Sequence, residues 1–322
     1  MKTLLVTVDS LRRDHIGYHG YERDTTPFLD SLARDNLVFE ECYSASCHTR
    51  EAVPPILTGK HPENCLDRYE LQAETIAEKL GKNGVKTTAF LTAPYLIRAN
   101  CYHRGFDEFY SDYRFGYSNL AMQLEYVYKV FKDRHYGTGL PMNQKVAEAV
   151  TRAEETFTWA HYMDVHQPYN KFDEWRWGEK ISPRRLQLIF RKAKHFPLSL
   201  TKKEREILVD AYDNSVRRFD ETMEDLFSRI PDDTKVFIVA DHGESLGEDG
   251  NYEHRRHLRD ELIEVPLIVR NGDSGTVEQP VSTTDIAPTI ADIYGVDMET
   301  EGARLDSRED RDIRASCRRM WK

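Results

Sequence analysis

The sequence predicts an α/β fold with a largely parallel central sheet, helices on both faces and a short C-terminal appendage. Short apolar runs of strand length alternate along most of the chain with stretches of helical periodicity, which is the pattern of consecutive βα units. Several of these apolar runs stop abruptly at an aspartate, as expected where parallel strands end at a ligand-binding edge. No internal repeat or Gly/Ser-rich linker interrupts the pattern.

The first predicted strand covers residues 4–8, where LLVTV is a continuous apolar run typical of a strand buried on both faces. Segments of helical period predict helices over residues 26–36, 74–80 and 201–230. Gly84 and Pro231 stop the second and the third of these helices. The other apolar runs predict strands over residues 86–91, 157–163, 235–240 and 265–269.

Two regions depart from this alternation. Residues 110–200 are rich in Tyr, Trp, Arg and Lys and show no clear strand apart from residues 157–163. We expect this region to be a lid or a substrate-recognition insertion. Residues 299–322 are dominated by charge, and we expect a charged C-terminal tail that forms a surface helix or a loosely held end.

The composition excludes some classes of protein. A formal net charge of -10 and a pI near 5.7 argue against a nucleic-acid-binding protein, which would normally present a basic face. They do not exclude an anionic substrate, because a bound metal ion and a few local cations can invert the field inside a pocket. No apolar stretch approaches the ~18 residues of a membrane span, so no membrane partner is expected.

The location of the protein is expected to be cytoplasmic. The apolar run of residues 4–8 is broken by Asp9, so it is too short for the core of a secretory signal. The cysteines are odd in number and lack C-x-x-C spacing, which is typical of reduced thiols. They are Cys42, Cys47, Cys65, Cys101 and Cys317.

Polar groups follow three of the predicted strands directly. These groups are Asp9-Ser10, Asp164-Val165-His166 and Asp241-His242-Gly243-Glu244. Because the carboxyl ends of parallel strands meet at one edge of a sheet, we expect these side chains to lie near one another. Carboxylate and imidazole groups are suitable ligands for Zn, Mn or a related divalent ion.

Several motifs resemble those of a known family. VTVDSLRRDHIGYHGYERDTTPFLDSLARDNLVFEECYSAS and the LTG that follows it resemble the start of the sulfatase-like members of the alkaline phosphatase superfamily. ADHGESLGEDGNYEHRRHLRDELIEVPLIVR and VSTTDIAPTIADIYG resemble its later landmarks. The resemblance covers roughly residues 1–110 and 155–295, and it implies that residues 1–298 form the catalytic domain of an ester hydrolase.

The resemblance also points to the nucleophile. Family members place it ten residues before the Gly of the L-T-G signature, and counting back from Gly59 reaches Thr49. Formylglycine-type sulfatases need Cys there within C-x-P-x-R, whereas Cys47 begins C-H-T-R-E, and Ser10 replaces the second acidic residue of the sulfatase pair. The resemblance therefore favours the threonine branch, whose members act on phosphate, phosphodiester, phosphonate or related esters.

The resemblance and the chemistry of the residue types assign the expected roles. Asp9, Asp241, His242 and Thr49 would hold a divalent ion (Mn, Zn, Ca or Mg), which would activate the threonine hydroxyl for formation of a covalent intermediate. Arg50 would contact two oxygens of a small anionic ester substrate. His166 and His254 would act as general acid and charge stabiliser, or would bind a second ion together with Asp164. The choice between one ion and two stays open at this point, as does the oligomeric state.

Other readings of the same residues compete with these roles. Thr49 is also a residue type that commonly caps a helix, and Arg50 is also typical of an exposed surface. His48 matches no family position and is interpreted as a bystander. Two alternative functions remain, namely a sulfuric ester hydrolase with the same site and a non-catalytic metal- or anion-binding module. Retention of all the core ligands and a hydroxyl nucleophile disfavours the binding module.

Overall fold

A mixed sheet forms the centre of the computed structural model, which describes residues 1–112, 139–169, 174–307 and 311–317. Within these residues the sheet has eight strands in the order β13-β2-β12-β9-β1-β8-β6-β7. Their bounds are β1 Lys2–Val8, β2 Leu37–Phe39, β6 Lys86–Leu91, β7 Glu108–Ser111, β8 Thr156–Tyr162, β9 Lys235–Ala240, β12 Leu267–Arg270 and β13 Gly275–Val277. β1 runs parallel to β8 and β9, and β6 runs parallel to β7 and β8. Because only β12 opposes its neighbours β9 and β2, the predicted largely parallel sheet is confirmed.

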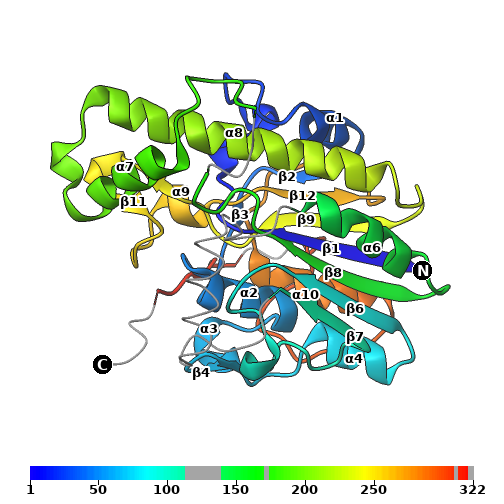
Figure 1. Cartoon of the computed structure of the whole chain (residues 1–322). Coiled ribbons are helices and arrows are strands. Elements are labelled where there is room, and N and C mark those ends of the chain that lie inside the picture. Colours follow the sequence, from blue (N-terminus) through cyan, green and yellow to red (C-terminus); the bar gives the residue numbers. More distant parts are fainter. Residues whose placement is uncertain (113–138, 170–173, 308–310, 318–322) are drawn as a thin grey trace.

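Helices cover both faces of this sheet, as predicted (Figure 1). One face carries α1 (Pro27–Asp35), α6 (Leu140–Val150) and α8 (Lys202–Phe227), and α8 packs against the other two. The opposite face carries α2 (Thr49–Thr58), α4 (Ile76–Lys82) and α10 (Ile286–Ile293), and α10 packs against the other two. The other α-helices of the described residues are α3 (Pro62–Cys65), α7 (Pro183–His195) and α9 (Asp260–Ile263). Among the described helices, none combines the length and the apolarity that a membrane span requires.

Three pairs of short strands lie outside the main sheet. β3 (Cys42–Tyr43) pairs in parallel with β14 (Val281–Ser282), whereas β4 (Leu66–Asp67) pairs antiparallel with β5 (Glu70–Leu71). β10 (Ser245–Leu246) and β11 (Tyr252–Glu253) form a further antiparallel pair. This last pair follows β9 directly, so it shapes the chain beyond the end of a central strand.

The long helix α8 begins where the sequence predicts but ends at Phe227, before the predicted end at residue 230. At its start the hydroxyl of Thr201 accepts a hydrogen bond from the amide of Glu204 at 3.2 Å, and the Glu204 carboxylate accepts one from the amide of Thr201 at 2.8 Å. This reciprocal capping box satisfies two amides that a helix N-terminus would otherwise leave without partners. The helix ends at Phe227, ahead of Pro231, which cannot continue it.

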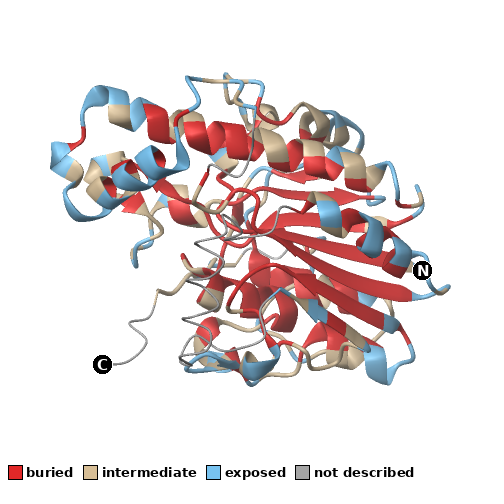
Figure 2. Cartoon of the chain, in the orientation of Figure 1, coloured by how far each residue is buried: buried red, intermediate tan, exposed pale blue. Residues whose placement is uncertain are grey.

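The centre of the sheet is fully buried (Figure 2). Leu4, Leu5, Val6 and Val8 of β1 have no exposed surface, because β8 and β9 flank this strand and helices cover both of its faces. Burial on both faces explains why β1 reads as a continuous apolar run rather than as an alternating one. The strand positions are therefore set by core packing, and the residues that directly follow the strands are held by it.

The region of residues 110–200 was expected to be an insertion, and part of it (residues 113–138 and 170–173) lies outside the described residues. Its described part contains two helices, α6 and α7, that the sequence analysis did not predict. Leu186, Ile189 and Ala193 form the buried side of α7, but basic residues surround them and weaken the apolar signal. A role for this region in substrate recognition stays a prediction.

The C-terminal tail follows the surface of the domain without forming a helix in residues 299–307 and 311–317. The amides of Glu301 and Gly302 donate to the carbonyl of Gly59 at 2.8 and 3.0 Å, and the amide of Ser316 donates to the carbonyl of Ala45 at 2.9 Å. Arg311 forms an ion pair with Asp285. The expected surface helix is therefore not found in the described part of the tail, whose backbone bonds to the body instead.

Gly105 permits a close contact between two segments of the fold, and its replacement by alanine is expected to destabilise the protein by about 3 kcal/mol. Its φ is +79°, and an added Cβ would lie 2.1 Å from the backbone nitrogen of Glu78 in α4. Gly84 is the matched control, because its φ is +84° and nothing lies within 4 Å of an added Cβ. Gly84→Ala should cost only the backbone strain, about 1 kcal/mol. Urea unfolding of the two variants measures the difference, and equal losses would contradict the steric argument.

Candidate active site

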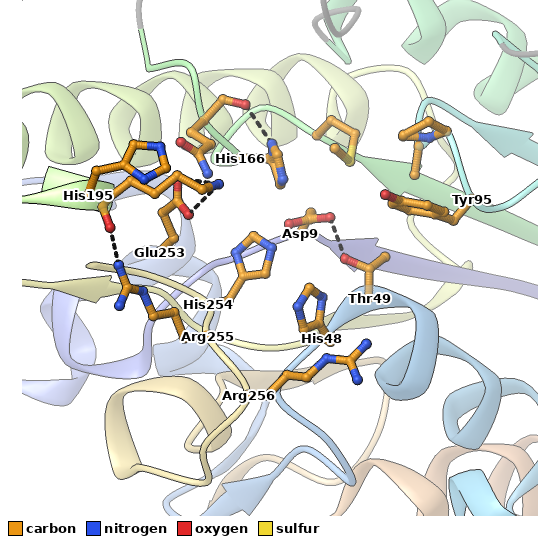
Figure 3. A pocket seen from close by; sticks show the side chains of 15 residues that line it. Asp9, His48, Thr49, Tyr95, His166, His195, Glu253, His254, Arg255 and Arg256 are labelled. Carbon is orange, nitrogen blue, oxygen red and sulfur yellow. Dashed lines mark hydrogen bonds and ion pairs between the residues drawn. The ribbon is translucent and has the colours of Figure 1, made fainter. Parts of the chain in front are cut away.

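A cavity of about 690 Å³ opens where the central strands β1, β8 and β9 end (Figure 3). Parallel strands direct their carboxyl ends to the same edge of the sheet, so this is the expected place for a ligand. The residues that line the cavity are Asp9, His48, Thr49, Ala93, Pro94, Tyr95, Met163, His166, Gln167, Lys194, His195, Glu253, His254, Arg255 and Arg256.

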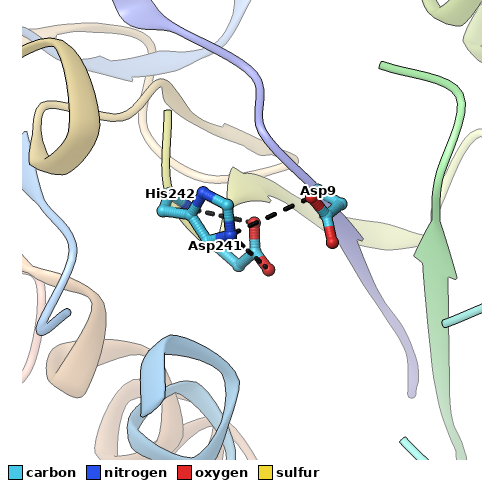
Figure 4. Close-up of side chains that lie close together, drawn as sticks. All are labelled: Asp9, Asp241 and His242. Carbon is cyan, nitrogen blue, oxygen red and sulfur yellow. Dashed lines mark hydrogen bonds and ion pairs between the residues drawn. The ribbon is translucent and has the colours of Figure 1, made fainter. Parts of the chain in front are cut away.

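Asp9, Asp241 and His242 form a compact buried cluster at the base of this edge (Figure 4). Asp9 directly follows β1, and the other two directly follow β9. One potential ligand atom from each residue lies within 4.8 Å of the others, and no side chain of the three is more than 1% exposed. The structure thus brings together the three residues that the sequence predicted as the core of a metal site.

The turn after β1 holds Asp9 in place. Ser10 adopts a left-handed backbone conformation with φ of 64°, and its hydroxyl donates to Oδ1 of Asp9 at 2.6 Å. The hydroxyl of Tyr212, on α8, donates to the carbonyl of Ser10 at 2.7 Å and accepts from the amide of Arg12 at 2.8 Å. The amide of Ser10 also donates to Oδ1 of Asp241 at 3.3 Å. The residue that replaces the family's second acid therefore positions both carboxylates.

The tautomer of His242 follows from its hydrogen bonds. Nδ1 lies 2.7 Å from the carbonyl oxygen of Gly243, and a carbonyl accepts only, so Nδ1 carries the proton. Burial lowers the pKa of His242 to about 4, which keeps the ring neutral. Nε2 therefore directs a lone pair toward Asp9 and Thr49, as a metal ligand requires.

Thr49 is the first residue of α2, and His48 occupies the N-cap position without a capping side-chain bond. The hydroxyl of Thr49 lies 3.0 Å from Oδ2 of Asp9 and 3.1 Å from Nε2 of His242. Its side chain thus points into the metal-ligand cluster, and the alternative interpretation of Thr49 as a helix cap does not describe its position. The start of a helix also carries partial positive charge, which favours an anion at this point.

The charges of the cluster fit a divalent cation. Burial and the neighbouring Asp9 raise the pKa of Asp241 well above its ordinary range. Burial also raises the pKa of Asp9, but the surrounding histidines, His166 first among them, outweigh this effect and hold that pKa below its ordinary range. Oδ2 of Asp241 is buried and has no hydrogen-bond partner among the described residues. Two adjacent buried carboxylates, one with an unsatisfied oxygen, and a neutral imidazole match the ligand preferences of Zn²⁺ or Mn²⁺.

Two further imidazoles, those of His254 and His166, lie beside the cluster of Asp9, Asp241 and His242. His254 lies with its ring centroid 4.7 Å from that of His242 and 5.6 Å from that of His166. Nδ1 of His254 donates to Oε1 of Glu244 at 3.2 Å. Nδ1 of His166 donates to the carbonyl of Gln167 at 2.5 Å. His166 and His254 both line the cavity, and their acid and charge-stabilising roles stay a prediction.

Sequence reasoning missed two histidines at the site. His48 lines the cavity, with its ring centroid 4.7 Å from that of His254. Its place directly before Thr49 was the available signal. His161 lies inside β8 and is fully buried, so it looked like a core residue in an apolar run. Its Nε2 lies 4.0 Å from Oδ2 of Asp9 and has no hydrogen-bond partner in the part of the chain that the structure describes.

The orientation of His161 is set by a chain of hydrogen bonds. The indole N–H of Trp159 donates to the hydroxyl of Thr7 at 2.9 Å, and that hydroxyl lies 2.7 Å from Nδ1 of His161. The Thr7 hydroxyl satisfies both contacts when it donates its own proton to Nδ1, which places the imidazole proton on Nε2. His161 therefore directs an N–H toward Asp9, as a residue that positions a ligand would.

The structure does not bring Asp164 to the cavity. Its carboxylate accepts hydrogen bonds from the amide of Gly139 at 2.9 Å and from the hydroxyl of Thr222 at 3.4 Å. These contacts hold the start of α6 against α8, because the chain turns toward these helices two residues after β8 ends. The expected second ion site of Asp164, His166 and His254 is not formed, and within the described residues only Asp9, Asp241 and His242 form such a group.

Arg50 lies beside the cavity rather than in its lining. Its guanidinium carbon is 3.8 Å from the ring centroid of Tyr95 and 4.8 Å from that of Tyr69. Stacking between two aromatic rings stabilises a cation in this position. Because the side chain is held by these rings, contact between Arg50 and substrate oxygens stays a prediction.

Removal of the Glu244 charge is expected to change how the stability of the metal-free protein depends on pH. Glu244 raises the pKa of His254 to about 8 against the lowering effect of burial. A raised pKa stabilises the folded state below the unfolded pKa of His, and this contribution is lost as pH rises through the folded value. In Glu244→Gln the free energy of unfolding should fall by about 2 kcal/mol near pH 6 and by much less near pH 9.

Urea unfolding in the presence of a chelator measures this difference. Tyr169→Phe is the matched control, because the Tyr169 hydroxyl donates to the other oxygen of Glu244 at 3.1 Å and its loss leaves the His254 pair in place. The wild-type pH dependence should persist in the control. A Glu244→Gln loss that is equal at both pH values would contradict the assignment.

Comparisons with known proteins agree with this geometry. The profile of the family described as Sulfatase matches residues 2–296. The chain is 25% identical over 273 residues to the phosphatidylethanolamine transferase Mcr-1 of Escherichia coli, over 78% of this chain and 44% of that protein. The chain thus spans less than half the length of this curated relative.

Solved structures show the same fold. The phosphonate monoester hydrolase of Agrobacterium radiobacter has a TM-score of 0.65 at 16% identity, over 94% of this chain and 76% of that chain. The C-terminal periplasmic domain of EcEptC from Escherichia coli, solved in complex with Zn, has a TM-score of 0.62 at 19% identity, over 91% of this chain and 82% of that chain. The α/β architecture is therefore that of the alkaline phosphatase and sulfatase group.

Proposed function

The chain belongs to the Sulfatase family, and on this premise we propose that it cleaves phosphate, phosphodiester, phosphonate or related esters with Thr49 as the nucleophile. Asp9, Asp241 and His242 would hold a divalent cation, with Thr49 beside it. That cation would supply Lewis-acid stabilisation of the non-bridging oxygens and would favour ionisation of the threonine hydroxyl. Zinc is the ion that we propose first, because the site offers imidazole as well as carboxylate ligands.

The observation that carries the proposal is the position of the Thr49 hydroxyl. It lies at the start of the ten-residue helix α2, 3.0 Å from a carboxylate oxygen of Asp9 and 3.1 Å from Nε2 of His242. A threonine hydroxyl is a poor nucleophile by itself, and an adjacent base or a metal ion is what activates it. A hydroxyl with only a packing role would not be expected to lie against two buried carboxylates and a neutral imidazole.

The residues of the cavity account for the proton transfers. Thr49, whose hydroxyl has lost its proton to solvent, attacks phosphorus through Oγ1, while the bond from phosphorus to the alcohol oxygen breaks. His254, whose pKa of about 8 keeps it protonated at neutral pH, donates a proton from Nε2 to the departing alcohol oxygen. The neutral His254 then accepts a proton from the water that attacks phosphorus, and the bond from phosphorus to Oγ1 breaks, so that Thr49 returns to its ionised form.

The molecule that accepts the phosphoryl group from Thr49 distinguishes a hydrolase from a transferase. Water gives net hydrolysis, whereas an alcohol in the same position would receive the phosphoryl group. The relative Mcr-1 is named as a transferase, and the phosphonate monoester hydrolase is named as a hydrolase. We propose hydrolysis for this chain, and an acceptor alcohol belongs among the reagents that test it.

Sulfate ester hydrolysis is the second candidate function, because the family profile carries the name Sulfatase. The formylglycine route to that activity requires a cysteine at the nucleophile position. Here Thr49 occupies that position, and the sulfur of Cys47 lies 2.9 Å from that of Cys317. These positions support the phosphate-type reaction over a formylglycine sulfatase.

A side-by-side assay tests the proposal. The substrates are p-nitrophenyl phosphate, bis-p-nitrophenyl phosphate, p-nitrophenyl phenylphosphonate and p-nitrophenyl sulfate, each with added Zn²⁺ or Mn²⁺. We expect turnover of at least one phosphorus ester and a phosphoryl adduct on Thr49 in acid-quenched samples analysed by mass spectrometry. Turnover of the sulfate alone would reject the proposal in favour of the sulfatase. Tight metal binding without turnover of any ester would favour a non-catalytic module.

A further inference from the structure

Two cysteines that are far apart in the sequence meet beside the active site. Cys47 is fully buried and precedes Thr49 by two residues, whereas Cys317 belongs to the C-terminal tail and is partly exposed. The thiol of Cys47 donates to Sγ of Cys317 at 2.9 Å, across 270 positions of sequence. By contrast, the thiol of Cys65 donates to the carbonyl oxygen of Pro62 at 3.9 Å.

Contacts that do not involve sulfur bring the two cysteines together. The amide of Ser316 donates to the carbonyl of Ala45 at 2.9 Å, and the hydroxyl of Ser316 donates to Oε2 of Glu63 at 3.1 Å. Arg314 forms an ion pair with the same glutamate. The tail is therefore held against α3 and against the segment that precedes α2 by contacts that do not involve sulfur, and the sulfur contact is a consequence of that path.

We propose that Cys47 and Cys317 are an oxidisable pair that a low-molecular-weight disulfide converts into a disulfide bond, which fastens the C-terminal tail to the segment that carries Thr49. This inference is independent of the proposed activity. It concerns a covalent modification site, and its partner is a small disulfide such as oxidised glutathione.

The reaction proceeds in two exchange steps. The thiolate of Cys317 attacks one sulfur of the small disulfide, so that a mixed disulfide forms and the first small thiol leaves. The sulfur of Cys47 then gives its proton to solvent and attacks the Cys317 sulfur, which releases the second small thiol. Two protein thiols and one small disulfide thus become one protein disulfide and two small thiols.

The surroundings explain why Cys317 reacts first. It is the more exposed of the two sulfur-bearing residues, so the small disulfide can reach it. The hydrogen bond from Cys47 lowers the pKa of Cys317 more than burial raises it, and the charge of Arg256 acts in the same direction. A thiol with a lowered pKa supplies more of the reactive thiolate. Arg256 also lines the active-site cavity, so the modified pair adjoins its wall.

The bond is expected to raise the melting temperature. It would close a loop between residues 47 and 317, and a cross-link of this span removes much of the conformational freedom of the unfolded chain. We expect the oxidised protein to melt about 5 °C higher than the reduced protein. Cys317→Ser should melt at the same temperature with or without the small disulfide.

Peptide mapping of the full chain identifies the bond. The native protein is incubated with oxidised glutathione, alkylated without reduction and digested with trypsin, which leaves Cys47 in residues 35–50 and Cys317 in residues 315–318. We expect these two peptides to be linked and to separate on reduction. Cys42 lies in the same tryptic peptide as Cys47, so Cys42→Ser is the matched control and should keep the link.

The variants decide the result. Cys47→Ser should lose the link and leave glutathione attached to Cys317. The proposal would be overturned by glutathione on both cysteines without a link between them, or by a link that survives in Cys47→Ser and is lost in Cys42→Ser. A linked protein whose melting temperature equals that of the reduced protein would refute the fastening of the tail.

Discussion

We expect Thr49→Ala to lower kcat/KM for the best phosphorus ester by about 10⁴-fold or more while the bound metal stays near wild-type content. The substitution removes the only atom that forms the covalent bond to phosphorus, whereas Asp9, Asp241 and His242 keep their positions around the ion. Steady-state kinetics measures the loss, and elemental analysis of the dialysed protein measures the metal.

Two further variants make this result specific. Thr49→Ser keeps a hydroxyl and should retain activity well above that of the alanine variant. Thr58→Ala alters the other end of α2, where the hydroxyl donates to the carbonyl of Pro54 at 2.8 Å, and it should keep kcat near wild type. Near-wild-type rates in Thr49→Ala would show that another group attacks the ester.

Asp241→Asn is expected to have opposite effects on the metal-bound and the metal-free protein. It removes an anionic ligand, so the affinity for Zn²⁺ should fall by at least about 100-fold. It also removes one of two adjacent buried acids, since burial and Asp9 raise the pKa of Asp241 well above its ordinary range. Without metal, the variant should therefore melt at a higher temperature than the wild type.

Thermal unfolding with saturating Zn²⁺ and with a chelator measures both effects. The wild type should show a large rise in melting temperature on addition of the ion, and Asp241→Asn should show little or none. Asp285→Asn is the matched control, because Asp285 is equally buried but pairs with Arg311 away from the cavity. This control should retain the rise. An undiminished rise in Asp241→Asn would show that the residue does not bind the ion.

The central strands were predictable from sequence because they are buried on both faces. Such strands read as uninterrupted apolar runs, and residues 86–91 and 235–240 coincide with β6 and β9. β2 and the edge strand β13 have three residues each, too few to establish a period. The helices α6 and α7 were missed for a different reason. Their apolar residues lie between polar and basic residues, so the helical period is weak, and tertiary packing determines which side of each helix is buried.

In the candidate site, too, some residues were predictable from the sequence and others were not. Asp9 and Asp241 were predictable because polar groups that begin with an aspartate recur directly after three predicted strands, within motifs that resemble those of a family. The orientation of Asp164 was not predictable, because nothing in the sequence indicates whether a residue after a strand turns to the cavity or to a covering helix. His161 was missed because it is a single polar residue within a predicted apolar strand. Its proximity to Asp9 depends on the pairing of β8 with β1, which the sequence does not reveal.

The order β9-β1-β8 at the middle of the sheet has a consequence for how such a protein can diversify. The groups that we propose to act on the phosphorus centre follow the buried central strands or start a helix packed on them, whereas Lys194 and His195 belong to the end of α7, outside the sheet. We expect sequence changes in α7 to exchange one alcohol for another without displacing the reacting atoms. A chimaera that carries the α7 segment of a relative should therefore inherit the relative's choice of alcohol and retain its own chemistry.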